Sequence, residues 1–231
     1  MLNDIKKIIQ EYETVIKIVD KNATSQEDRA YGGVIRSVKG KLQEYITEEL
    51  VKIAWKNLGA DISRLEINSK KIKIPILLDY IENLQDNNIK NYIKNNIDDY
   101  YYNLSVDKHI FVDDKFIMGI ECKAYTENAM IKRILVDFQL LKTIYPDISC
   151  HLFQLESQLG GDYSALNKIT YGAKPTHSIM SYFPKVDLHI TTFLQGERNI
   201  DKPIHKIFKP LNKNILKNAV IFLQSFLKRY K

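Results

Sequence analysis

Hydrophobic residues recur at intervals of three and four in four parts of the chain, the spacing of a helix that buries one face. They predict helices over residues 3–19, about 37–58, about 127–145 and about 214–229. A polar loop over 21–29 and the pair Gly32-Gly33 separate the first two helices, and Gly59 is expected to end the second. Thr126 is expected to cap the third, which stops before Pro146.

Alternating apolar and polar positions, the period of a strand, appear in other short runs. They predict strands over 64–68 and 71–77, where a sheet begins, and over 149–155 and about 188–194. Two further strand-like runs flank Asp113-Asp114, a pair typical of a hairpin turn. The polar segment 79–102 is predicted to be a helical excursion from the sheet.

This order of elements indicates an α/β fold. A strand, a helix and another strand follow one another between residues 115 and 155, which favours a parallel pair. A chain of 231 residues with 45% hydrophobic and 27% charged residues fits one globular domain, and no repeat or linker divides it. No apolar run is long enough to span a bilayer and no signal sequence begins the chain, so we expect a cytoplasmic protein.

Cysteine content and charge narrow the chemistry. Cys122 and Cys150 are the only cysteines, so the sequence predicts reduced thiols rather than disulfides or a zinc site. The net charge of +6 and the isoelectric point near 9.0 fit a polyanionic partner. Lysine supplies most of this charge, and an A/T-rich genome also produces lysine and asparagine, so the charge alone decides nothing.

Residues 105–125 carry the candidate chemistry. A tight turn at Asp113-Asp114 brings Asp107 opposite the region of Ile120 and Glu121. Glu121 and Lys123 are two residues apart on one strand, so they share a face. One hairpin therefore collects two carboxylates and an amine. Two acidic ligands for a divalent cation and a neighbouring ammonium are what phosphodiester hydrolysis requires.

The short pattern of an acid two residues before a lysine is not specific by itself. It occurs three times, at Asp4-Lys6, Asp113-Lys115 and Glu121-Lys123. The first lies on a helix and the second at a turn tip, where solvated charges are usual. The third continues the apolar strand 116–120, where isolated charges are costly. A solvent-facing pair on an edge strand is the alternative, and the addition of Asp107 favours a metal site.

This part of the chain resembles the active site of the PD-(D/E)xK nucleases. It consists of Ser105-Val106-Asp107, thirteen further residues and Glu121-Cys122-Lys123, followed by a helix and a strand. Val106 stands where these nucleases often have proline. The segment 32–41, which leads into a glutamate-bearing helix, resembles the openings of several Type II restriction endonucleases. The resemblance covers residues 32–156.

The resemblance implies a restriction-endonuclease-like fold, a mixed central sheet flanked by helices, and a Mg²⁺-dependent enzyme that cuts double-stranded DNA. Asp107 and Glu121 would be the metal ligands, and Lys123 would orient the attacking water or help to deprotonate it. A helical glutamate would assist, with Glu44 as the first candidate and Glu48 as the alternative. Residues 1–31 would be an N-terminal helix and loop, 32–156 the catalytic core, and 157–231 a region for DNA recognition and dimerisation. A homodimer would match a palindromic site.

Other polar residues are candidates for contacts around this core, each with an ordinary alternative. Arg198 is of a type that binds guanine through two hydrogen bonds, although a rim salt bridge is commoner. Gln154 and Glu156 share one strand face and either border the site or face solvent. The loop at Gly160-Gly161 either approaches a groove or is a simple turn. The predicted DNA-binding residues are Arg198, Lys202, Lys206, Asp162 and Tyr163.

Two other functions compete with a restriction endonuclease. One is a repair or junction-resolving nuclease with the same fold, which would recognise DNA structure and not sequence. The other is a non-catalytic DNA-binding protein with a nuclease-like fold, against which the presence of Asp107, Glu121 and Lys123 argues. No phosphate-cradling glycine loop or serine hydrolase motif is present, so no nucleotide cofactor is expected.

Overall fold

The centre of the structure is a five-stranded mixed sheet. A computed structural model describes residues 1–24, 29–198 and 208–231, with the backbone alone for 20–24 and 29–36. The strand order is β1-β4-β5-β6-β7. The strands are β1 (Leu65–Asn68), β4 (Lys108–Val112), β5 (Lys115–Thr126), β6 (Ser149–Ser157) and β7 (Leu188–Thr192). The pairs β1/β4 and β4/β5 are antiparallel, whereas β5/β6 and β6/β7 are parallel. The predicted α/β class and the parallel pair are confirmed.

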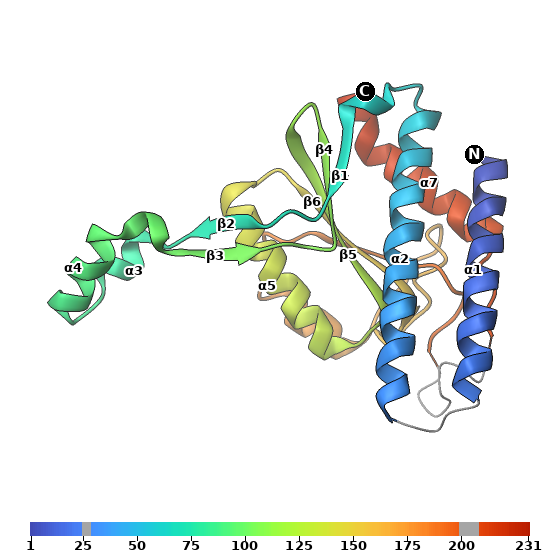
Figure 1. The fold of residues 1–231 in the computed structure, drawn as a ribbon, viewed down its shortest axis with the longest axis horizontal. Coiled ribbons are helices and arrows are strands. Elements are labelled where there is room, and N and C mark those ends of the chain that lie inside the picture. Colours follow the sequence, from blue (N-terminus) through green and yellow to red (C-terminus); the bar gives the residue numbers. More distant parts are fainter. Residues whose placement is uncertain (25–28, 199–207) are drawn as a thin grey trace.

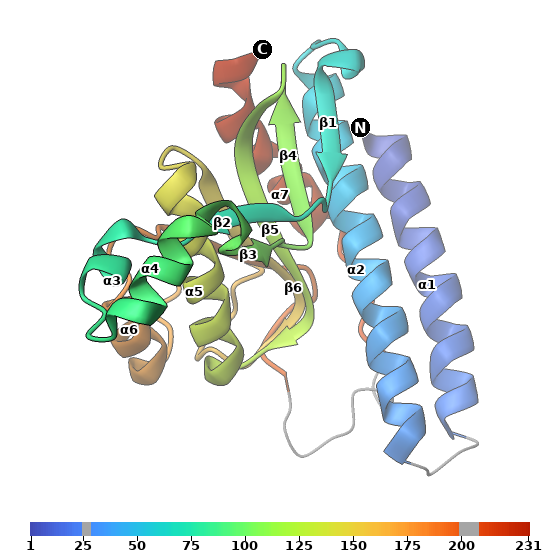
Figure 2. The same cartoon turned by 60° about the vertical axis from the view of Figure 1, so that its left-hand side comes forward.

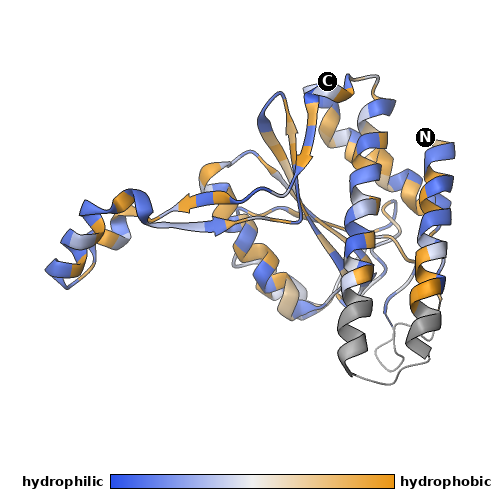
Figure 3. Ribbon diagram, viewed as in Figure 1, coloured by the Kyte–Doolittle hydropathy of each residue, from blue (hydrophilic) through white to orange (hydrophobic). Residues whose placement is uncertain are grey.

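Helices cover both faces of this sheet (Figures 1 and 2). On one side lie α1 (Leu2–Thr24), α2 (Arg29–Asn57) and α7 (Lys213–Leu227), which contact one another. On the other lie α5 (Asn128–Ile144) and α6 (Lys174–Met180). Figure 3 shows hydrophobic and hydrophilic residues alternating along α2 and α5, as expected for helices that bury one face. No helix within the described ranges is long and apolar enough to cross a membrane.

A second, two-stranded sheet forms an arm that projects from the body (Figure 1). It consists of β2 (Ile72–Pro75) and β3 (Tyr101–Leu104), with α3 (Leu78–Glu82) and α4 (Asn87–Asn95) between them. The excursion predicted over 79–102 is therefore present. The prediction that 71–77 belongs to the same sheet as 64–68 is wrong, because β2 pairs with β3 and only β1 joins β4.

The hairpin of β4 and β5 forms as predicted. Asp113 and Asp114 have φ values of 49° and 62°, the left-handed backbone that a two-residue hairpin turn requires. Val112 pairs with Lys115, and a register shift between Ile110 and Phe111 makes Lys108 the partner of Ile120. This shift places the preceding residue, Asp107, beside Glu121.

Several predicted boundaries differ from the structure. The second helix begins at Arg29 and not near Ser37, so Gly32-Gly33 lies inside it. Continued helical hydrogen bonding outweighs the helix-destabilising effect of glycine, about 1 kcal/mol for each residue. Thr126 is the last residue of β5 and not the cap of α5, whose N-cap, Glu127, makes no side-chain capping bond. Helix α6 was not predicted, because its seven residues are too few to show a period.

A pH dependence of stability follows from His151, which lies on β6 against Phe222 and Phe226 of α7. Its ring is fully buried, and neither nitrogen has a hydrogen-bond partner in the described structure. Burial holds the pKa of His151 well below its ordinary value, and His189 nearby lowers it further. Below about pH 6.5 the unfolded chain therefore binds a proton that the folded chain does not. The free energy of unfolding decreases as the pH is lowered.

We expect His151→Phe to remove this dependence. The free energy of unfolding of the variant should exceed that of the wild type, and the difference should grow by roughly 2 kcal/mol between pH 7 and pH 5. Urea denaturation at both pH values measures it. The exposed residue His177 gives a control, His177→Phe. A difference that is constant with pH would contradict the assignment.

Candidate active site

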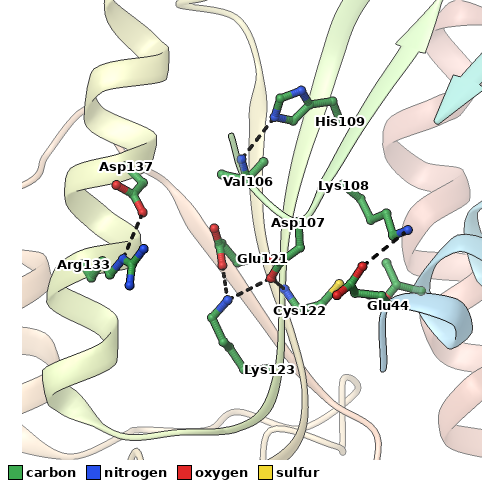
Figure 4. Close-up of polar contacts among 11 residues, drawn as sticks. Glu44, Val106, Asp107, Lys108, His109, Glu121, Cys122, Lys123, Arg133 and Asp137 are labelled. Carbon is green, nitrogen blue, oxygen red and sulfur yellow. Dashed lines mark hydrogen bonds and ion pairs between the residues drawn. The ribbon is translucent and has the colours of Figure 1, made fainter. Parts of the chain in front are cut away.

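Asp107, Glu121 and Lys123 meet at the end of the hairpin (Figure 4). The ammonium of Lys123 lies 2.8 Å from Oδ2 of Asp107 and also bonds Oε2 of Glu121. Strand β5 supplies Glu121 and Lys123 on one face, and Asp107 comes from the residue before β4. The structure therefore brings together the three residues that the sequence predicts as one site.

Two of these groups, Glu121 and Lys123, have shifted pKa values. The Glu121 side chain is only 7% exposed, and burial raises the pKa of its carboxyl group to about 7, although Lys123 opposes this. For Lys123, burial would lower the pKa, but Glu121 and Asp107 outweigh it and raise the pKa above its ordinary value. Lys123 is therefore a protonated cation. The ionised form of Glu121 would be stabilised by any further positive charge nearby.

Two hydrogen bonds hold Asp107 and the residue before it in place. Oδ2 of Asp107 accepts a hydrogen bond of 2.7 Å from the backbone N–H of Cys122. The neighbouring N–H of Val106 donates to Nε2 of His109, a buried residue, at 3.1 Å. Both contacts orient the Asp107 carboxylate toward β5. Cys122 itself points to the opposite face and bonds Thr47, which agrees with the predicted reduced core thiol.

The three residues open into a cleft of about 400 Å³ between β5 and α5. Helix α5 contributes Arg133 and Asp137, which no sequence motif marks. Their charged groups are 3.8 Å apart. Burial raises the pKa of Asp137, while Arg133 and Lys123 lower it. Both residues lie beside the apolar stripe that predicted the helix. This position at the edge of the buried face is the one feature of the sequence that indicates a place beside the site.

The predicted helical glutamates lie on the other side of Asp107. Lys108, the residue after Asp107, pairs with Glu44 at 3.7 Å and with Glu48 at 3.1 Å. Figure 4 shows Glu44 and Lys108 on the side away from α5. Neither glutamate lines the cleft. They contact the neighbour of a predicted metal ligand and not Lys123.

The donor set at the cleft fits Mg²⁺. Within the described ranges, no group of three or more histidine, cysteine or acidic side chains is placed to hold a metal. Asp107 and Glu121 offer two carboxylates, and Mg²⁺ is commonly bound by one or two carboxylates together with substrate phosphates and waters. A pair of carboxylates in an open cleft therefore suits a cation that is shared with a phosphate substrate.

The other two occurrences of the acid-x-lysine pattern, Asp4-Lys6 and Asp113-Lys115, lie on the surface as predicted. Asp113 pairs with Arg64 at 2.5 Å, and both side chains are at least partly exposed. Asp4 pairs with the N-terminal amine at 2.7 Å. Glu121-Lys123, in contrast, lines the cleft between β5 and α5.

The remaining candidates divide into three groups. Gln154 is buried opposite Lys123 in the β5/β6 register and donates to Thr192, so it does not face solvent. Asp162 accepts hydrogen bonds from Ser164 in its own turn, and Tyr163 packs partly buried against the core on the α5 side. Lys202 and Lys206 lie outside the described residues.

Two carboxylates and a lysine in a cleft of a mixed sheet fit a hydrolase that cleaves phosphodiesters. Comparison with known proteins gives a narrower result. The chain is 55% identical over 230 residues to the Type II restriction enzyme DdeI of Desulfomicrobium norvegicum. The alignment covers 97% of this chain and 96% of that enzyme. No protein-family model matches the chain. The chain therefore belongs to the family of Type II restriction enzymes.

Proposed function

We propose that the cleft at Asp107, Glu121 and Lys123 is the active site of a Mg²⁺-dependent restriction endonuclease of the PD-(D/E)xK type. Its reaction is sequence-specific hydrolysis of phosphodiester bonds in double-stranded DNA. The observation that carries this proposal is the ammonium of Lys123 bonded to both carboxylates in a cleft open to solvent. Membership of the restriction enzyme family supplies the substrate class.

Each residue has a separate role in the proposal. Asp107 and Glu121 would hold Mg²⁺, whose charge would neutralise the scissile phosphate and lower the pKa of the attacking water. Lys123, protonated by its surroundings, orients that water for in-line attack on phosphorus. Glu44 and Glu48 act from the other side by holding Lys108 and thus the backbone beside Asp107.

The rest of the chain completes the proposed enzyme. A single nuclease domain spans residues 1–231, with residues 157–231 as the region for DNA recognition and dimerisation. One active site per chain cuts one strand, so two chains related by two-fold symmetry would cut both strands of a palindromic site. We propose a homodimer in the cytoplasm, with the predicted contacts at Arg198, Lys202, Lys206, Asp162 and Tyr163 directed to DNA.

Digestion of a plasmid and of a long phage DNA tests the function. With Mg²⁺ we expect discrete fragments whose ends map to one short sequence, and with EDTA no cleavage. The structure-specific alternative predicts cleavage of branched or flapped DNA without discrete fragments from linear DNA. The non-catalytic alternative predicts binding without cleavage. Either outcome would overturn the proposal.

A further inference from the structure

A second cationic group lies on the catalytic face of the sheet, beyond the three site residues. Strand β5 continues from Lys123 to Tyr125, which is two residues further and therefore on the same face. The guanidinium carbon of Arg198 lies 3.8 Å from the centre of the Tyr125 ring. A cation–π stack thus stands about 7 Å along the strand from the catalytic lysine.

Arg198 is held in place from three directions. Its backbone N–H donates to the carbonyl oxygen of Ser157 at 2.9 Å, where residue 197 forms a bridge with the end of β6. Its Nη1 donates to the side-chain oxygen of Gln158 at 3.1 Å, and the guanidinium plane rests on Tyr125. A partly buried arginine fixed in this way loses little conformational freedom when it binds a ligand.

The charge of Arg198 is nevertheless not neutralised. In the described part of the chain it forms no ion pair with a carboxylate, and its Nε is buried without a hydrogen-bond partner. The nearby carboxylates are engaged elsewhere. Glu156, the partner of Tyr125 in register, pairs with Lys209 at 2.7 Å, and the carboxylate of Glu197 accepts from the backbone N–H of Gly161. Free donors on a fixed cation are suited to an anion.

We propose that Arg198, seated on Tyr125, binds a backbone phosphate of the substrate DNA one or two nucleotides from the scissile bond. The distance along β5 fits this, because phosphates follow one another every ~3.4 Å of helix axis along one strand. The inference rests on the proposed function. It makes Arg198 a residue that positions DNA without selecting bases, in place of the guanine contact that the sequence suggests.

Binding as a function of salt tests the phosphate contact. Wild-type cleavage is mapped first, which tests the proposed function separately. Affinity is then measured by fluorescence anisotropy, with Ca²⁺ in place of Mg²⁺, for a duplex that carries the cleavage site and for one with the site scrambled. Arg198→Ala should weaken binding to both duplexes by a similar factor and reduce the slope of log affinity against log salt by about one.

Matched variants separate a charge effect from a folding defect. Arg198→Lys should keep the salt slope, and Tyr125→Phe should keep the wild-type affinity. Arg229 is a control, because it is an exposed arginine over a tyrosine ring, 5.0 Å from the centre of Tyr230, near the hairpin-turn end of β5. Arg229→Ala should leave the slope unchanged.

Two results would overturn the inference. If Arg198→Ala weakens only the duplex that carries the site, Arg198 contacts a base. If it changes neither affinity nor slope while the wild type cleaves DNA, the stack on Tyr125 is structural only. Failure of the wild type to cleave any DNA would instead count against the proposed function.

Discussion

Lys123→Met is expected to lower the rate of DNA cleavage about a thousandfold, the usual loss when a group that orients or stabilises reacting atoms is removed. Methionine keeps most of the length of the side chain but removes the ammonium that bonds both Asp107 and Glu121. Single-turnover cleavage of a mapped duplex at saturating Mg²⁺ measures the rate. DNA binding in the presence of Ca²⁺ should be retained, because Lys123 is only one of many positively charged side chains that attract the DNA.

Lys115 provides the matched control for this variant. It is an exposed lysine at the other end of β5, so Lys115→Met removes the same charge from the same strand. We expect its cleavage rate to stay within about twofold of the wild type, since surface changes of this kind are nearly neutral. If Lys123→Met also retained the wild-type rate, the lysine would have no part in the chemistry.

Phe138→Ala is expected to give the largest loss of stability, about 3–5 kcal/mol, which is a large part of the 5–15 kcal/mol typical of a folded domain. Phe138 is fully buried and packs α5 against the sheet. It lies so close to Gly119 of β5 that a Cβ there would approach the Phe138 ring to 2.8 Å. Removing the ring leaves a cavity between α5 and β5.

Urea denaturation compares Phe138→Ala with Val136→Ala on the same helix. Val136 is 41% exposed, so its truncation should change the free energy of unfolding by less than about 0.5 kcal/mol. Equal effects of the two variants would contradict the packing of α5 described above.

The hairpin and the meeting of the three candidate site residues were predictable because they depend on local patterns. Asp113-Asp114 fixes the turn, and the two-residue period of a strand fixes which side chains share a face. Glu121 and Lys123 lie at the end of an apolar strand, and a second carboxylate, Asp107, lies across the hairpin turn, so their proximity needs no long-range information. The metal, the dimer and the division into regions remain predictions.

The features that sequence reasoning missed depend on contacts between distant segments. Alternation predicted β2 as a strand, but only the fold shows that its partner is β3, which follows two short helices. Arg133 and Asp137 carry no motif, and only the position of α5 over β5 shows that they line the cleft. The stack of Arg198 on Tyr125 joins residues that are far apart in the sequence and meet at the carboxyl ends of β5 and β6. No local period specifies such a pair.

The measurement that tests the central claim most directly is cleavage of plasmid DNA by Glu121→Ala beside the wild type, with and without Mg²⁺. Glu66→Ala is the control, because Glu66 is a largely exposed glutamate on β1 that pairs with Lys70. We expect discrete Mg²⁺-dependent fragments from the wild type and the control, and none from Glu121→Ala. Undiminished fragments from Glu121→Ala would place the active site elsewhere in the chain.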